Sequence, residues 1–173
     1  MGAPREIVPP EAIAERVKQL GRRIAEDFAG KDLVLVGILK GATFFLADLL
    51  RAIPCSVRYE LVNVTRSSGG HYEVIELAFA TRINIAGAHA LILKDICHSG
   101  VTENYLLTHL AQQGPASMDV VAMVNKPELR RVALEPRYVL LDHVPGGRLV
   151  GYGMEYQGKW GNLPGICLLD EPA

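Results

Sequence analysis

The chain has 173 residues, a formal net charge of −1 and a hydrophobic content of 49%. A near-neutral chain lacks the basic face that nucleic acid binding requires, so no nucleic acid partner is expected. The length suits a single domain, residues 1–173, which would bury roughly 70% of the surface of the unfolded chain.

The cysteine pattern and the absence of long apolar runs limit the class of protein. Cys55, Cys97 and Cys167 are odd in number and widely separated, which indicates neither a disulfide framework nor a zinc site. No stretch approaches 18 apolar residues, and the N-terminus has no apolar run of signal length. We expect a soluble cytoplasmic protein without a membrane partner.

The first half of the chain alternates between helical and strand patterns. Apolar residues spaced three or four apart over 9–28 predict an amphipathic helix that begins at two prolines and ends near Gly30. Residues 32–39 are almost continuously apolar and predict a strand buried on both faces. A broad apolar stripe over 43–52 predicts a second helix, which places Lys40 between strand and helix.

The later elements complete an α/β pattern. Residues 55–65 and 72–79 predict a hairpin joined by a polar loop at 66–71, and residues 90–93 predict a buried strand that leaves the sheet at Lys94. Further strands are predicted at 117–124, 138–141 and 166–169, with a turn at 144–147. The order predicts a doubly wound, mainly parallel sheet with an inserted hairpin and a small cap formed by the terminal segments.

The stretch that follows the strand at 90–93 predicts an anion site. Ser99 and Gly100 supply a turn, and a helix is expected to begin at Val101. Ligands of open α/β sheets gather outside the carboxyl ends of the strands. A helix start at that place offers unpaired N–H groups and the positive end of the helix dipole, so a phosphate is the expected ligand. Cys97, beside this helix start, is interpreted as an apolar filler rather than a reactive thiol.

The amino-acid sequence of the same stretch resembles the phosphoribosyl pyrophosphate (PRPP) motif of type I phosphoribosyltransferases. That motif has a hydrophobic strand, two acids, two apolar residues, Asp-Thr-Gly and a further Thr. The residues in step with it are Asp95, Ile96, Cys97, Gly100 and Thr102. Three positions differ, because Lys94 replaces the first acid, His98 replaces the Asp that handles the purine proton, and Ser99 replaces the Thr.

Three other segments resemble the bacterial hypoxanthine-guanine phosphoribosyltransferases, in the same order over nearly the whole chain. They are the pyrophosphate loop at 39–42, the purine lysine segment at 125–131 and the carboxyl-terminal signature at 150–164. The resemblance implies the type I phosphoribosyltransferase fold and a purine salvage reaction. In that reaction hypoxanthine or guanine and PRPP give IMP or GMP and pyrophosphate. It also implies a homodimer or homotetramer.

The resemblance further implies a role for each matched residue. The 5′-phosphate would be bound by the loop His98, Ser99, Gly100, Val101 and Thr102, and the ribose by Lys94 and Asp95. Pyrophosphate would be bound by Lys40 and Gly41, and the purine by Lys126, Arg148 and Leu149. His98 and Lys126 would act in catalysis, and Asp95 and Glu155 would hold Mg²⁺. An imidazole is an acid–base group near neutral pH, so His98 can accept the purine proton.

Several other family positions differ in this chain. Arg148 replaces the aromatic residue that stacks on the base, although a guanidinium can also stack on a purine. Glu155 replaces the magnesium Asp, and Gly161 replaces an Arg that binds pyrophosphate. The Ser-Tyr pair of the lid has become Arg66-Ser67-Ser68 in a shortened loop.

These differences leave two alternatives open. An ammonium at Lys94 would repel Mg²⁺ and attract phosphate. Compared with the acid of the family, this reversal of charge changes the interaction energy with a charge about 4 Å away by on the order of 1 to 4 kcal/mol. Alternatively, Lys94 pairs with Asp95 or Glu155 and neutralises a site that no longer needs metal. For the whole protein, a purine phosphoribosyltransferase competes with a purine-nucleotide-binding regulator or paralogue partner that has lost turnover. Without the resemblance, Lys40 and Lys126 are ordinary surface charges and His98 is incidental.

Overall fold

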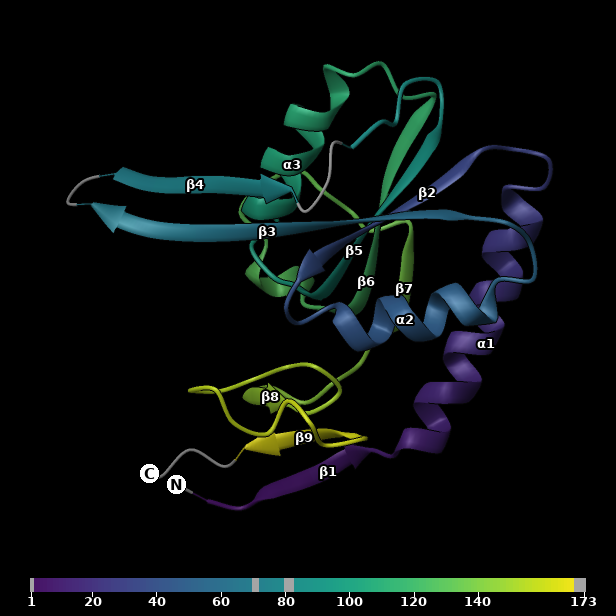
Figure 1. Ribbon diagram of the computed structural model, residues 1–173. Helices are drawn as coiled ribbons and strands as arrows, with labels where there is room; N and C mark the ends of the chain where they lie inside the picture. The colour runs from purple at the N-terminus through teal and green to yellow at the C-terminus, as the bar shows by residue number, and fades with distance from the viewer. Residues whose placement is uncertain (1, 70–71, 80–82, 170–173) are drawn as a thin grey trace.

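A six-stranded sheet and a three-stranded sheet form the framework of the protein (Figure 1). The computed structural model describes residues 2–69, 72–79 and 83–169, with the backbone alone for 66–69 and 72–74. The elements are β1 (Pro4–Val8), α1 (Pro10–Asp27), β2 (Leu33–Leu39), α2 (Thr43–Ala52), β3 (Arg58–Gly69), β4 (Tyr72–Phe79), β5 (His89–Cys97), α3 (Val101–Ala111), β6 (Ser117–Asn125), the 3-10 turn η1 (Pro127–Leu129), β7 (Tyr138–Leu141), β8 (Arg148–Val150) and β9 (Ile166–Leu169). Among the described residues, no helix is both long and apolar enough to span a membrane.

The larger sheet has the strand order β4-β3-β2-β5-β6-β7. All neighbouring strands are parallel except β3 and β4, which form the antiparallel hairpin. After β2 the chain first adds β3 on one side of β2 and then β5 on the other side. The order in which strands are added therefore reverses between β2 and β5, which makes this the topological switch point. The predicted doubly wound sheet is confirmed, and the crevice beside this switch point is where such sheets bind ligands.

Helices cover both faces of the sheet, which explains the continuously apolar strands. Alternate residues of β2 enter two separate cores, because Leu33 and Leu35 pack with α1 and α2 while Val34 and Val36 pack with α3. The helix α1 begins at Pro10 and turns its apolar stripe inward, as the spacing predicted. The buried residues of that stripe are Ile13, Val17, Leu20 and Ile24.

Two predicted boundaries are wrong, and pairing with neighbouring strands is the reason. Residues 66–69 do not form a loop but continue β3, with Arg66 opposite Ile75 and Gly69 opposite Tyr72. The hairpin projects beyond the rest of the sheet (Figure 1), and its two strands pair with each other over this length. Likewise β5 does not end at Leu93, because β6 continues to pair with it up to Cys97.

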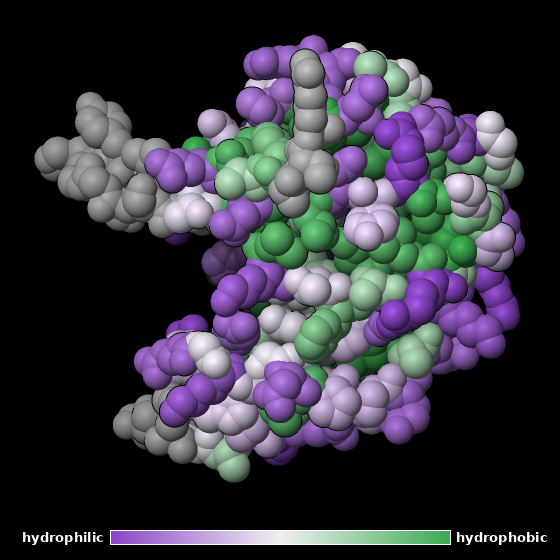
Figure 2. All heavy atoms as spheres, in the orientation of Figure 1, coloured by the Kyte–Doolittle hydropathy of each residue, from purple (hydrophilic) through white to green (hydrophobic). Residues whose placement is uncertain are grey.

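The terminal segments form the expected cap. Strand β9 lies between β1 and β8 in an antiparallel sheet, which brings the first and last described strands side by side. This small sheet faces the carboxyl end of the larger one (Figure 1), and the molecule is hollowed between them (Figure 2). The cap therefore supplies a second wall for any ligand at the switch point.

Gly21 allows α1 to lie against α2. A Cβ added at Gly21 would lie 2.7 Å from the backbone oxygen of Ala52. We expect Gly21→Ala to lower the free energy of unfolding by about 1–3 kcal/mol through overpacking, although alanine is the better helix former. Urea unfolding measures the change, and Gly146→Ala is the matched control because nothing lies within 4 Å of its added Cβ. A Gly21→Ala protein as stable as the control would contradict close helix packing.

Candidate active site

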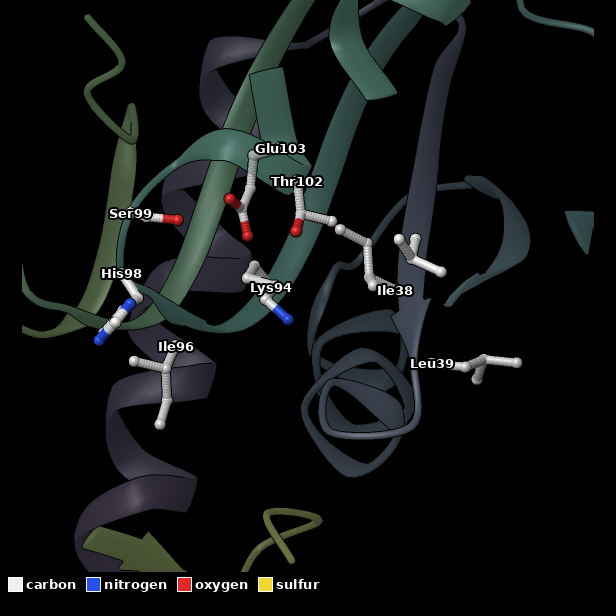
Figure 3. Close-up of a pocket in the computed structure, with 9 residues that line it drawn as sticks. Ile38, Leu39, Lys94, Ile96, His98, Ser99, Thr102 and Glu103 are labelled. Atoms are coloured by element: carbon white, nitrogen blue, oxygen red, sulfur yellow. The ribbon is translucent and has the colours of Figure 1, made fainter. Parts of the chain in front are cut away.

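Three of the cavities in the described part of the chain are lined by residues at or just after the carboxyl ends of β2, β5 and β6. The α3 cavity, about 290 Å³, lies between the end of β2 and the start of α3 (Figure 3). The β8 cavity, about 390 Å³, shares His98 with it, and the α2 cavity, about 730 Å³, shares Glu155 with the β8 cavity. Most residues predicted to bind phosphate, ribose, pyrophosphate or base line one of these adjoining cavities. Gly41, Gly100 and Val101 do not line them but are next in the chain to residues that line them or to their neighbours.

The start of α3 has the backbone of an anion site. Gly100 precedes the helix with φ 76°, and a Cβ there would lie 2.8 Å from Val132. Both the left-handed backbone and the close approach therefore require glycine. Ser99 Oγ accepts the N–H of Val101 at 3.4 Å, and the buried Thr102 lines the cavity. The positive end of the α3 dipole faces this space.

Arg130 fixes the loop in front of α3, a role that sequence reasoning missed. Its guanidinium donates to the sulfur of Cys97 at 2.8 Å, to the carbonyl of His98 at 2.9 Å and to the side-chain oxygen of Asn125. The backbone N–H of Arg131 donates to the carbonyl of Ser99 at 2.9 Å. The segment after β6 thus holds the loop after β5, and only the folded chain brings these two segments together.

Cys97 is a structural residue. Burial raises the pKa of its thiol, and the nearby Glu103 carboxylate raises it further, against the opposing effects of Arg130 and Lys94. A thiol with a raised pKa is a poor nucleophile at neutral pH. This agrees with its interpretation as an apolar filler.

Lys94 and Asp95 point to different parts of the site. Lys94 lies on the α3 side of β5 and lines the α3 cavity, whereas Asp95 lines the β8 cavity. Their side chains meet at the strand end, where Lys94 Nζ is 2.9 Å from Asp95 Oδ1. The other carboxylate oxygen of Asp95 lies against Gly41, because a Cβ added at Gly41 would be 1.8 Å from it. Gly41 thus lets the loop after β2 touch the end of β5.

Glu103 is a further site residue that the sequence did not single out. It lies in the first turn of α3, is 2% exposed and lines the same cavity as Lys94. Figure 3 shows Glu103 and Thr102 projecting from α3, and Lys94 from β5, toward the same space. Acidic residues are common in the first turn of helices. The sequence therefore gives no signal that the acid at position 103 is buried rather than exposed.

The β8 cavity gathers the residues predicted for the base. Lys126 Nζ donates to the carbonyl of Gly147 at 3.3 Å, and Leu149 forms part of the apolar wall. The guanidinium of Arg148 lies 4.2 Å from the centre of the Tyr156 ring. Arg148, which lines the β8 cavity, thus makes a cation–π contact with Tyr156. Sequence reasoning identified Arg148 but not the role of Tyr156.

The α2 cavity contains the predicted pyrophosphate residues. The Leu39–Lys40 peptide is cis. Lys40 Nζ lies 3.9 Å from Glu155 Oε2. A Cβ added at Gly161 would lie 2.9 Å from Glu155 Cγ, so the longer acid at 155 fills space beside 161. The two departures from the family pattern are therefore linked by packing.

We expect Arg130→Met to release the loop before α3. Loss of its hydrogen bonds removes the donor from the buried Cys97 sulfur and the half-buried Asn125 oxygen, and should lower the free energy of unfolding by about 1–3 kcal/mol. Backbone amides of residues 98–102 should also exchange faster with deuterium. Urea unfolding and hydrogen exchange measure both effects, with Arg131→Met as a control because its side chain is exposed. Unchanged exchange at 98–102 would show that Arg130 does not hold the loop.

The comparisons with known proteins agree with this arrangement. The model of the phosphoribosyl transferase domain matches residues 5–156. The hypoxanthine-guanine phosphoribosyltransferase of Streptococcus pneumoniae is 34% identical over 95% of this chain and 92% of its own length. That of Mycobacterium avium is 33% identical over 95% of this chain and 84% of its own length.

Solved structures show the same relationship. A crystal structure of a Bacillus anthracis hypoxanthine-guanine phosphoribosyltransferase has a TM-score of 0.89 and 31% identity, covering 98% of this chain and all of that one. A Trypanosoma cruzi hypoxanthine phosphoribosyltransferase in a ternary complex with substrates also has a TM-score of 0.89, with 32% identity over 96% of this chain and 95% of its own. The chain therefore belongs to the phosphoribosyltransferase family and is homologous over nearly its whole length to the hypoxanthine-guanine phosphoribosyltransferases.

Proposed function

We propose that the protein makes IMP or GMP from hypoxanthine or guanine and PRPP and releases pyrophosphate. One observation supports this proposal: groups suited to base, sugar phosphate and pyrophosphate line cavities that share residues beside the switch between β2 and β5. The start of α3 would bind the 5′-phosphate through backbone N–H groups and the hydroxyls of Ser99 and Thr102. Lys40 and the backbone of Gly41 would bind pyrophosphate.

The chemical step joins purine N9 to C1′ of the ribose. The bond from C1′ to the pyrophosphate oxygen breaks, and its electron pair leaves with pyrophosphate. His98, which lines both the α3 and β8 cavities, would accept the proton from N7 and pass it to water. Lys126 would donate to the 6-oxo group, which favours a 6-oxopurine over adenine. Lys40 would offset the charge that develops on the leaving pyrophosphate.

The base would stack on the guanidinium of Arg148, which packs on the Tyr156 ring. A guanidinium offers a flat surface with N–H groups at its edge, so it can replace an aromatic platform. Leu149 would contact the base from the buried side. The Tyr156 ring supports this platform in the present fold.

Magnesium, which the resemblance implies, would fall to Asp95 and Glu155. Each of these carboxylates is close to an ammonium, Asp95 to Lys94 and Glu155 to Lys40. These residues do not fit a resident Mg²⁺ between them, so we propose no step that depends on it.

A nucleotide-binding regulator or paralogue partner without turnover is the second candidate. The ion pairs of Lys94 and Lys40 favour it, because they occupy the side of the site that handles the diphosphate.

We also propose a cytoplasmic location, a single domain over 1–173 and a homodimer or homotetramer. The first is supported by the free cysteines Cys55, Cys97 and Cys167, and the last by the family resemblance.

Turnover separates the two candidates. The native chain with PRPP and hypoxanthine or guanine should form IMP or GMP, detected by chromatography. Lys126→Met should lower kcat/KM by roughly 10- to 100-fold, because a hydrogen bond to the 6-oxo group is lost. Lys18→Met, on the exposed side of α1, is the control. If GMP stabilises the native fold but no IMP or GMP is formed, the result supports the regulator. If Lys126→Met has the kcat/KM of the native chain, Lys126 does not bind the base.

His98→Ala tests the proposed base separately. We expect kcat to fall about 100-fold or more, because a positioned acid–base group is removed. Binding of GMP, measured by calorimetry, should change little, since the phosphate loop uses the backbone at this position. His109→Ala, on the exposed side of α3, is the control. Equal turnover by the two variants would dismiss His98 as the proton acceptor.

A further inference from the structure

The α3 cavity contains a buried carboxylate that the proposed reaction does not use. Glu103 lies in the first turn of α3, is 2% exposed and lines this cavity. Figure 3 shows its side chain projecting from α3 toward the space that Thr102 also borders. Burial raises the pKa of the Cys97 thiol and the Glu103 charge raises it further, so this carboxylate lies near the end of β5.

No ion pair or side-chain hydrogen bond joins the Glu103 carboxylate to another described residue, and the ion pair at the end of β5 joins Lys94 to Asp95 instead. In the described chain, Arg130 Nε is the one enclosed side-chain polar atom without a hydrogen-bond partner, so the Glu103 oxygens open onto the cavity. Burial of a carboxylate is costly unless hydrogen bonds or charges compensate, and the dipole of α3 compensates only in part. A hydrogen-bond donor from a ligand would complete the site.

The charged and titratable groups around Glu103 come from two segments. They are Lys94, Asp95, Cys97 and His98 from β5 and the loop after it, and Arg130 from the segment after β6. The described residues that β2 and β3 contribute to the cavity are apolar. Lys94 contacts Asp95, and Arg130 contacts the loop before α3. A ligand in the cavity therefore meets the Glu103 carboxylate as well as the N–H groups of α3.

The carboxylate changes which form of a phosphate fits this cavity. A doubly ionised phosphate has acceptors only, so it would be repelled by the Glu103 oxygens. A singly protonated phosphate has one O–H group, which can donate a short, charge-assisted hydrogen bond to a carboxylate. Its other oxygens can still accept from Ser99, Thr102 and the start of α3. A phosphate monoester loses its second proton near about pH 6, so both forms are accessible near neutral pH.

We propose that Glu103 accepts a hydrogen bond from a singly protonated oxygen of the sugar phosphate, so that the α3 cavity selects the monoanion and takes up a proton when a nucleotide binds. The proton comes from solvent and stays between the phosphate oxygen and the carboxylate, and no other bond changes. This inference rests on the proposed nucleotide site and assigns to it a phosphate-binding residue, Glu103. Binding of phosphate is thereby coupled to pH.

Calorimetry with GMP, in buffers of different ionisation enthalpy, tests the proposal. The native chain should take up about one proton per GMP near about pH 7.5, and its Kd should rise nearly tenfold from about pH 7 to about pH 8, as the monoanion becomes scarce. Glu103→Gln should take up almost no proton, and its Kd should change by less than about threefold over this range. Glu11→Gln makes the same change in the exposed first turn of α1 and should behave as the native chain.

His98 is the other group in this cavity that titrates near neutral pH. His98→Ala separates the two residues, because proton uptake should persist in this variant if Glu103 holds the protonated phosphate. Uptake that is lost in His98→Ala and kept in Glu103→Gln would assign the proton to the imidazole and overturn the proposal. A carboxylate that serves only the stability of α3 would leave both proton uptake and the pH dependence of Kd unchanged in Glu103→Gln, with the same consequence.

Sulfate provides a test that needs no variant. It has the shape of phosphate but carries no proton near neutral pH, so it cannot donate to Glu103. In competition with GMP for the native chain, inorganic phosphate should be at least about tenfold more effective than sulfate. In Glu103→Gln the two anions should compete within about threefold of each other. Equal competition by the two anions in the native chain would contradict the selection of the monoanion. If Glu103→Gln does not fold, proton uptake and anion preference of the native chain still decide.

The outcomes also separate this inference from the proposed function. Binding of GMP by the native chain without proton uptake would overturn the inference and leave the nucleotide site intact. No binding of GMP at any pH in this range would overturn the proposed function, and the inference with it.

Discussion

The contact between the loop after β5 and the segment after β6 is the constraint on which the site depends. Parallel strands end at one edge of a sheet, but their loops need not hold a common shape. Here Arg130 donates to the sulfur of Cys97 and to the carbonyl of His98, and Gly100 turns the chain into α3. The same segment carries Lys126, whose backbone N–H donates to the carbonyl of Cys97. These hydrogen bonds therefore tie the loop before α3 to the segment that carries Lys126.

A second theme is the redistribution of charge around that unit. Lys94 lies beside Asp95 and Lys40 beside Glu155, and a buried acid, Glu103, lies in the α3 cavity. Two of these positions also pack against each other, since the side chain of Glu155 occupies the space next to Gly161. The departures from the family pattern are thus mutually adjusted rather than independent losses. Such adjustment is what is expected when a site is retained with a changed ligand requirement.

The core of the fold was predictable from local patterns. Continuous apolar runs at 32–39 and 117–124 indicated strands buried on both faces, and the helix over 10–27 followed from its 3.6-residue spacing. The hairpin length and the end of β5 were not predictable, because backbone pairing with a neighbouring strand decides them. Polar residues such as Lys94 can continue a strand when the next strand supplies hydrogen bonds.

By itself the sequence determined the α/β class, the family, and the residues that meet at the carboxyl edge of the sheet. Apolar periodicity and the order of motifs along the chain carry that information. Only the tertiary structure decided which charges pair. It joins Lys94 to Asp95 and Lys40 to Glu155, stacks Arg148 on Tyr156 and buries Glu103. The reason is physical: the energy of a charge depends on its burial and on partners from distant segments, which spacing along one chain does not encode.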